Sequence, residues 1–157
     1  MGWKMKKVVV FGTHDFAQLA LYYLKSDSPY EVAAFSVDRA FMGGATRFEG
    51  LPLVAFEDVQ TLYPPDEYAF FVPMAPTKMN RNREKIYLAA KAKGYEFISY
   101  VHSRSIVYDN TPIGENCFIL ENNVVQPYAS IGNNVTLWCG NIIGHHAQIS
   151  DHVFFTY

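Results

Sequence analysis

The 157-residue sequence predicts an α/β protein in two parts, a parallel sheet with helices followed by a parallel β-helix. The first hundred residues alternate apolar runs of strand length with amphipathic runs of helix length, a pattern typical of a parallel α/β sheet. From residue 113 onward an apolar side chain returns at every sixth position. Neither the period of a helix nor that of a flat strand gives a strict six, whereas a β-helix of hexapeptide repeats does.

The first part contains strands and helices in alternation. Expected strands lie at residues 7–11, 31–37, 51–54, 68–72 and 96–100, and expected helices at residues 15–25, 56–62 and 78–93. Gly94 is the natural C-cap of the last helix. We therefore expect a Rossmann-like parallel sheet over residues 1–100 and the β-helix over residues 101–157, with residues 102–110 as the bridge between them.

The second part is a series of hexads, each one short strand and one turn. The repeated apolar position is held by Ile113, Ile119, Val125, Ile131, Leu137, Ile143, Ile149 and Phe155. Three positions later a column of residues tolerates the left-handed backbone region, namely Asn116, Asn122, Asn134, His146 and His152. These residues are expected to form the turns. The series stops with an open strand edge, so we expect the natural protein to continue beyond Tyr157.

Composition narrows the function classes. A formal net charge of −2 without a basic run argues against nucleic-acid binding. The first apolar run is too short for a signal segment or a membrane span. Cys117 and Cys139 are isolated in the sequence and are expected to be reduced thiols of a cytoplasmic protein. An aromatic content of 16% hints at a subunit interface.

Candidate ligand-binding residues follow the first two strands, because ligands of open α/β sheets gather at the carboxyl ends of the strands. Gly12, Thr13 and His14 follow the first strand, where backbone N–H groups at a helix start favour a phosphate. Asp15 is expected to cap that helix. Asp38 and Arg39 follow the second strand, at the position that meets a ribose or base. The alternative is that this part is only a scaffold and that Asp38 and Arg39 are simply solvated.

The long helix carries a third candidate group at its start. Asn80, Arg81 and Arg83 lie in its first turns, where positive charge opposes the helix dipole. A bound anion would relieve that conflict, so Asn80 and Arg81 are candidate substrate contacts. Pairing with Glu84 and nearby acids is the alternative.

Histidines in the β-helix are the stronger signal. Aligning the hexads places His145 in a column of outward, polar turn residues, so its side chain should be exposed. An exposed imidazole can accept a proton at neutral pH, as a general base must. His146 is adjacent and is a second candidate catalytic residue. Together with His152 these residues also raise a metal hypothesis, but their columns point in different directions and no accompanying cysteine or carboxylate ligands are evident.

The two-part order and the run IGHHAQISDHV at residues 143–153 resemble the NeuD/PglD-like sugar O- and N-acyltransferases, which are hexapeptide-repeat proteins. The resemblance implies a left-handed β-helix with three hexads to a coil. It implies an N-terminal domain that holds a nucleotide-linked amino sugar and acetyl-CoA lying along the β-helix between subunits of a homotrimer. His145 would be the base that accepts the proton of the sugar amine, and a backbone amide would stabilise the oxyanion.

The sequence departs from this family at three places. His146 stands where the family has an acidic residue that orients the base, Phe154 stands where it has a second histidine, and the glycine-rich loop is reduced to Gly12. We therefore expect an acetyl-CoA-dependent acyltransferase that modifies the amino group of a nucleotide-linked amino sugar in polysaccharide or glycan synthesis. The alternatives are an O-acetyltransferase of a sugar hydroxyl, a non-catalytic trimeric sugar-nucleotide-binding scaffold, and an enzyme of metal-dependent hydration or hydrolysis.

Overall fold

The computed structural model describes residues 6–156, which form two compact units. The first unit contains residues up to 75 together with residues 88–97, and the second contains residues 76–87 and 98 onward. The long helix α3 (Arg81–Ala92) therefore contributes to both. The expected division into a domain of residues 1–100 and a domain of residues 101–157 stays a prediction.

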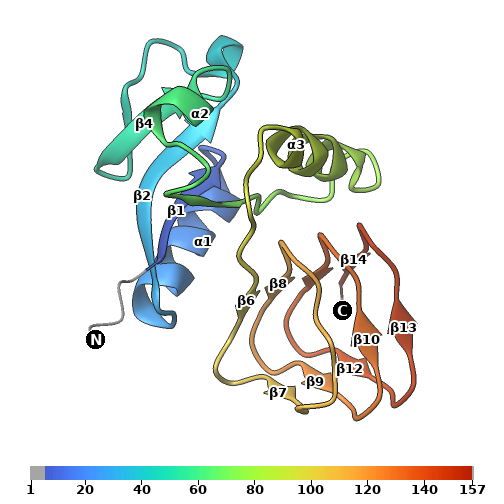
Figure 1. Ribbon diagram of the computed structural model, residues 1–157. Coiled ribbons are helices and arrows are strands. Elements are labelled where there is room, and N and C mark those ends of the chain that lie inside the picture. The colour runs from blue at the N-terminus through green and yellow to red at the C-terminus, as the bar shows by residue number, and fades with distance from the viewer. Residues whose placement is uncertain (1–5, 157) are drawn as a thin grey trace. The chain divides into compact units, whose positions relative to one another are not determined.

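The first unit is a five-stranded sheet in the order β3-β4-β2-β1-β5 (Figure 1). Its parallel strands are β1 (Lys6–Phe11), β2 (Tyr30–Val37), β4 (Leu51–Ala55) and β5 (Ala69–Phe71), and the edge strand β3 (Arg47–Phe48) is antiparallel. Helices α1 (Asp15–Ser26) and α2 (Val59–Leu62) connect the strands, and a short 3-10 helix spans Arg39–Phe41. The predicted parallel α/β sheet is confirmed.

The central strands of the sheet are buried because they are continuous apolar runs, as expected where both faces are covered. Fully buried side chains include those of Val8, Val9, Val10, Phe35, Phe70 and Phe71. The last expected strand, 96–100, is wrong in its extent. An isolated bridge between Phe97 and Phe70 joins this segment to the sheet, and Tyr100 already pairs with Phe118 in the second unit.

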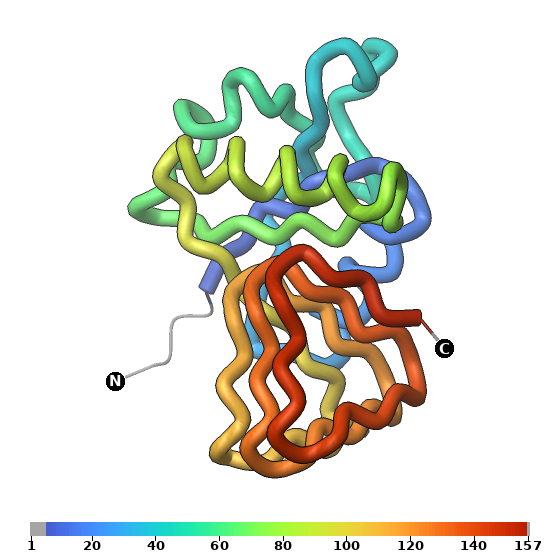
Figure 2. The backbone as a smooth tube through the Cα atoms, turned by 90° about the vertical axis from the view of Figure 1, so that its right-hand side faces the viewer, coloured from blue at the N-terminus to red at the C-terminus, as the bar shows by residue number. Residues whose placement is uncertain are grey.

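The second unit is a parallel β-helix whose coils stack on one another (Figures 1 and 2). Tyr100 pairs with Phe118, and Phe118 pairs with Thr136, so one coil takes 18 residues. One wall contains β6 (Tyr100–Val101), β8 (Phe118–Ile119), β11 (Thr136–Leu137) and β14 (Phe154–Phe155). The second contains β7 (Ile106–Val107), β9 (Val124–Val125) and β12 (Ile142–Ile143), and the third β10 (Ser130–Ile131) and β13 (Gln148–Ile149).

The hexad register begins earlier than expected. Val101 and Val107 occupy the same repeated position, two hexads and one hexad before Ile113, and both pack against the β-helix core. The segment 102–110 is therefore part of the first coil and does not only bridge the two units. The core itself contains the predicted inward residues, among them Ile119, Val125, Ile131, Leu137 and Ile143.

The turn column is confirmed at every predicted position. Asn116, Asn122, Asn134, His146 and His152 all have φ between 55° and 63°. The start of helix α3 differs from the prediction, because residues 78–80 have φ values of 51° to 65° and form a left-handed turn. The helix therefore starts at Arg81 and not at residue 78.

Candidate active site

His145 lies on the outside of the β-helix, shortly after β12, and its side chain is exposed as predicted. Its backbone N–H donates to Oε1 of Gln126, which lies in the preceding coil, at 2.9 Å. The Nδ1 atom of its ring lies 3.0 Å from Nδ1 of His146. Since Nδ1 is engaged in this way, Nε2 is the ring nitrogen that can meet a substrate proton. Within residues 6–156 no carboxylate contacts His145.

His146 forms the corner beside His145, with φ of 61°. Its ring is stacked on that of Tyr128, which occupies the same corner one coil below, with ring centroids 4.9 Å apart and planes 29° apart. The two predicted catalytic residues are therefore in contact with each other. The stacking partner Tyr128 was missed, although its spacing of 18 residues from His146 is visible in the sequence.

His152 does not join this pair, because it lies at a different corner above Asn116 and Asn134. Its Nδ1 is 2.9 Å from the side-chain nitrogen of Asn134, and its Nε2 is 3.6 Å from Oε1 of Glu84 on helix α3. The three imidazoles thus do not converge on one point. In the part of the chain that the structure describes, no group of three histidine, cysteine or acidic side chains is arranged to hold a metal ion.

Gly12, Thr13 and His14 connect β1 to α1 at the carboxyl edge of the sheet. Gly12 has φ of 121°, and its N–H donates to the carbonyl of Ser36 on β2 at 2.9 Å. His14 is the N-cap of α1 and makes no side-chain cap, so the expected capping by Asp15 is wrong. Asp15 is instead the first helical residue, where its negative charge interacts favourably with the helix dipole.

Asp38 and Arg39 follow β2 at the same edge. Arg39 is held by acids: its N–H donates to the carboxylate of Glu57 at 3.0 Å, and its guanidinium donates to Asp58 at 2.7 Å. The hydrogen bond from Arg39 to Asp58, followed by their mutual attraction, raises the pKa of the guanidinium. The buried hydroxyl of Ser36, also near the end of β2, has no hydrogen-bond partner among the described residues. This hydroxyl is a polar group that the sequence analysis missed.

Asn80 and Arg81 belong to the second unit. Arg81 is exposed, whereas Asn80 is buried and donates from Nδ2 to the carbonyl of His152 at 2.7 Å. Arg83 was expected to meet a bound anion or to pair with a nearby acid. Its side chain is instead fully buried. It donates to the carbonyls of Asn116 at 2.7 Å and Asn134 at 3.2 Å. Burial lowers the pKa of Arg83 to about 10, so it stays charged at neutral pH.

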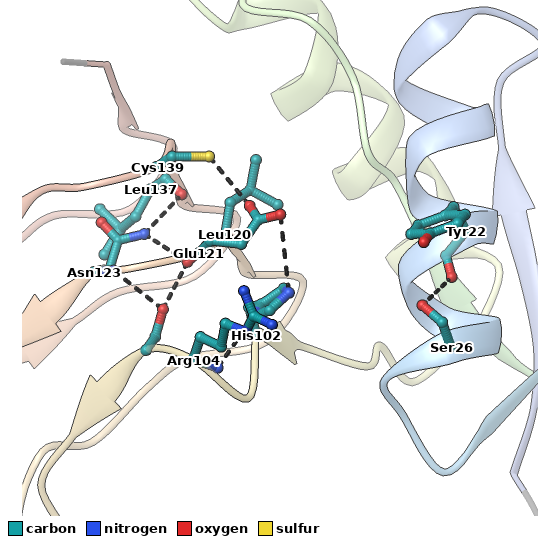
Figure 3. Close-up of polar contacts among 10 residues, drawn as sticks. Tyr22, Ser26, His102, Arg104, Leu120, Glu121, Asn123, Leu137 and Cys139 are labelled. Carbon is teal, nitrogen blue, oxygen red and sulfur yellow. Dashed lines mark hydrogen bonds and ion pairs between the residues drawn. The ribbon is translucent and has the colours of Figure 1, made fainter.

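A second polar cluster joins residues of three successive coils (Figure 3). Glu121 lies between His102, whose Nε2 is 3.8 Å from Oε1, and Cys139, whose thiol donates to Oε2 at 3.2 Å. Burial first, and then the contact with Glu121, raises the pKa of Cys139. Burial also raises the pKa of Cys117. Raised values keep both thiols protonated at neutral pH, so neither suits a nucleophile.

No protein-family model matches the sequence, and the comparison with curated proteins finds no match. Among solved structures, the acetyltransferase domain of PglB from Neisseria gonorrhoeae is similar, with a TM-score of 0.80 and 19% identity over 95% of this chain and 70% of that one. The chain has the fold of a sugar acetyltransferase.

Two further solved structures lead to the same assignment of the fold. PerB from Caulobacter crescentus, in complex with CoA and GDP-perosamine, has a TM-score of 0.79 and 19% identity over 98% of this chain and 70% of that one. WeeI from Acinetobacter baumannii has a TM-score of 0.74 and 20% identity over 95% of this chain and 68% of that one. The PglB domain has also been solved in complex with acetyl-CoA. The match covers both units of the chain.

Proposed function

We propose that this protein is an acetyl-CoA-dependent acetyltransferase that acts on the amino group of a nucleotide-linked amino sugar. The observation that carries the proposal is the exposed His145 on a β-helix corner, with Nδ1 engaged by His146, in a chain with the fold of sugar acetyltransferases. PerB, one of the similar structures, binds CoA and GDP-perosamine. A 4-amino sugar linked to GDP, UDP or dTDP is therefore the substrate class to test.

In the proposed reaction the sugar amine attacks the thioester carbonyl of acetyl-CoA. Nε2 of His145 accepts the proton that the attacking nitrogen loses, and a backbone N–H stabilises the oxyanion. The tetrahedral intermediate then collapses with cleavage of the C–S bond, and the imidazolium returns the proton to the CoA thiolate. The products are an acetamido sugar and free CoA. An amine is a better nucleophile than a hydroxyl, which favours N-transfer over O-transfer.

The carboxyl edge of the sheet is the proposed nucleotide-sugar site. Thr13 and His14 would meet the diphosphate with their backbone amides at the start of α1, and Gly12, whose N–H is bonded to Ser36, would form the turn that leads to them. Asp38 would meet the ribose, at the position that follows the second strand of such a sheet. Arg39 already forms an ion pair with Asp58. It would therefore contribute to the binding of the nucleotide more by its position at this edge than by its charge. Asn80 and Arg81 stay candidate substrate contacts from the second unit.

We propose a homotrimer in which acetyl-CoA lies along the β-helix between subunits. Support comes from the wall formed by β7, β9 and β12, which exposes Ile106 and Ile142 at 55% and 72% in one vertical column. Aliphatic side chains on an exposed sheet face favour burial by another chain. We propose a cytoplasmic location, which fits the two free cysteines. No helix in residues 6–156 has the length and apolar character to cross a bilayer.

The test is release of free CoA thiol from acetyl-CoA in the presence of GDP-, UDP- and dTDP-linked 4-amino sugars. We expect turnover with one of them and a loss of about 100-fold to 10,000-fold in kcat/KM for His145→Ala, the contribution of a general base. His152→Asn is the matched control, because Asn116 and Asn134 fill the same corner in the coils below. It should keep activity within about twofold if His152 only shapes the corner. A fully active His145→Ala variant would remove His145 as the base.

The non-catalytic scaffold is distinguished by the same experiment. It predicts nucleotide-sugar binding by calorimetry without thiol release from any donor and acceptor pair. Turnover with a neutral sugar in place of the amino sugar would instead indicate an O-acetyltransferase.

A further inference from the structure

One corner of the β-helix is built differently from the others. Elsewhere the corner residues include Asn116, Asn122, Asn134 and His152, whereas this corner stacks an aromatic residue, Tyr128, on His146. Tyr128 has φ of 65° and its side chain is 64% exposed. A bulky aromatic residue is strained in the left-handed region, and burial does not compensate here. Asparagine would form the same turn without that strain, so the turn alone does not account for the tyrosine.

The ring of Tyr128 has a specific neighbour. It lies nearly parallel to the imidazole of His146 at 4.9 Å, and that imidazole in turn meets Nδ1 of His145 at 3.0 Å. The three rings thus form a chain from the strained corner to the proposed base. The N–H of His145, bonded to Gln126, holds the backbone of the base in place.

We propose that His146, supported by the face of Tyr128, is a positioning residue that fixes the tautomer of His145 and shares the positive charge that His145 acquires when it accepts a proton. This inference rests on the proposed function. His146 stands where related acyltransferases are expected to have an acidic residue, so an imidazole and an aromatic ring replace a carboxylate. Tyr128 is thereby given a role that neither the fold nor its corner position requires.

The proton inventory is consistent with this role. In the hydrogen bond between the two Nδ1 atoms, one of these atoms must carry the hydrogen. A neutral imidazole carries a hydrogen on one nitrogen, so Nδ1 of His145 must carry it if Nε2 of His145 is to accept a proton. When Nε2 accepts the proton of the sugar amine, the resulting imidazolium donates a charge-assisted hydrogen bond from Nδ1 to His146. Movement of that Nδ1 proton to His146 would place the charge over the face of Tyr128, a favourable cation–π arrangement. Return of the proton to CoA restores both neutral rings.

In the column of His145, the described residues of the preceding coils hold no charge nearer than that of Asp109. Pro127 lies directly below His145 in its column, and Asp109 lies two coils below, roughly 10 Å away at the usual strand spacing. Tyr128 is the titratable group in contact with His146 within the described residues, besides His145 itself. The acid limb of the pH–rate profile should therefore report the pair.

The experiment compares His146→Asn, His146→Asp and Tyr128→Asn with the wild type. All three new residues tolerate the left-handed corner, so thermal unfolding should show folded proteins, and Tyr128→Asn should be at least as stable as the wild type. An asparagine in place of His146 would accept the hydrogen bond but could not take the proton, whereas an aspartate there would hold the imidazolium more strongly. The pH at half-maximal kcat/KM on the acid side should therefore be lowest for His146→Asn and highest for His146→Asp. Tyr128→Asn should lower kcat/KM about twofold to tenfold and move that pH below the wild-type value.

Unchanged acid limbs in all three variants would overturn the proposal, as would full activity of Tyr128→Asn. A readout without turnover separates this failure from failure of the proposed function. Nitrogen-15 NMR of histidine side chains should show His145 protonated at Nδ1 in the wild type, with mixed tautomers in Tyr128→Asn. Absence of thiol release by the wild type would refute the proposed function. Mixed tautomers of His145 in the wild type would refute the positioning role of His146. Tyr128→Phe is the matched control and should behave as the wild type, because the ring face and not the hydroxyl makes the contact.

Discussion

Gly132→Ala is expected to destabilise the protein strongly, although it adds one methyl group on the outside of the β-helix. The new Cβ would lie within 2.8 Å of the backbone nitrogen of Asp151 in the next coil and closer still to its Oδ1 atom. That carboxylate oxygen accepts the N–H of Asn133 at 2.7 Å. The glycine leaves the space through which the Asp151 side chain reaches this N–H. The same arrangement recurs one coil below, where Asn133 passes Gly114 to accept the N–H of Glu115 at 2.9 Å.

The magnitude follows from two terms. Overpacking against a fixed backbone costs about 1–3 kcal/mol. Loss of the hydrogen bond to Asp151 adds about 1 kcal/mol, at the low end for a charged acceptor because the site is exposed. The free energy of unfolding should therefore fall by about 2–4 kcal/mol, measured by urea denaturation with an unchanged m-value. Gly144→Ala is the control, because its Cβ meets nothing within 4 Å, and it should change stability by less than about 0.5 kcal/mol. Equal stability of the two variants would refute the packing argument.

Two further predictions concern buried polar groups. Arg83→Met should lower the free energy of unfolding by about 2–4 kcal/mol, because the buried carbonyls of Asn116 and Asn134 lose their donor; urea denaturation within about 1 kcal/mol of the wild type would contradict this. Burial raises the pKa of Tyr95 to about 12, above its ordinary value of 10. A raised pKa means that the folded protein favours the neutral phenol. The contribution of neutral Tyr95 to the free energy of unfolding should therefore be complete below pH 10 and be lost as the pH rises from 10 towards 12. The stability of the wild type should therefore fall more steeply over this range than that of Tyr95→Phe, and parallel curves would show that Tyr95 does not cause the loss.

Much of the β-helix could be predicted because its signal is local and periodic. A strict six-residue repeat fixes which side chains point inward, and the left-handed corners require residues that tolerate positive φ. The same alignment placed His145 outside, where the structure has it. The register could have been traced back to Val107 and Val101, and doing so would have shown that the first coil starts near Tyr100.

The start of α3 could not be predicted in this way. Residues 78 to 80 adopt the left-handed region, which Lys78 and Met79 do not favour, and Asn80 in this turn is anchored to the carbonyl of His152. That partner is 72 residues away in sequence. Arg83 is a similar case, since a charged residue in the first turn of a helix indicates a solvated position. Backbone carbonyls at the coil corners satisfy it instead.

The sequence by itself determined the two-part α/β and hexapeptide architecture, the corner columns and the exposure of His145, because each depends on the period of the chain and on local backbone preference. The tertiary structure decided which side chains meet across the coils. It brought Tyr128 onto His146, His146 onto His145, and Arg83 into the β-helix. Most of these contacts join residues one coil or more apart, and their geometry depends on how each coil stacks on the next, which no local pattern specifies.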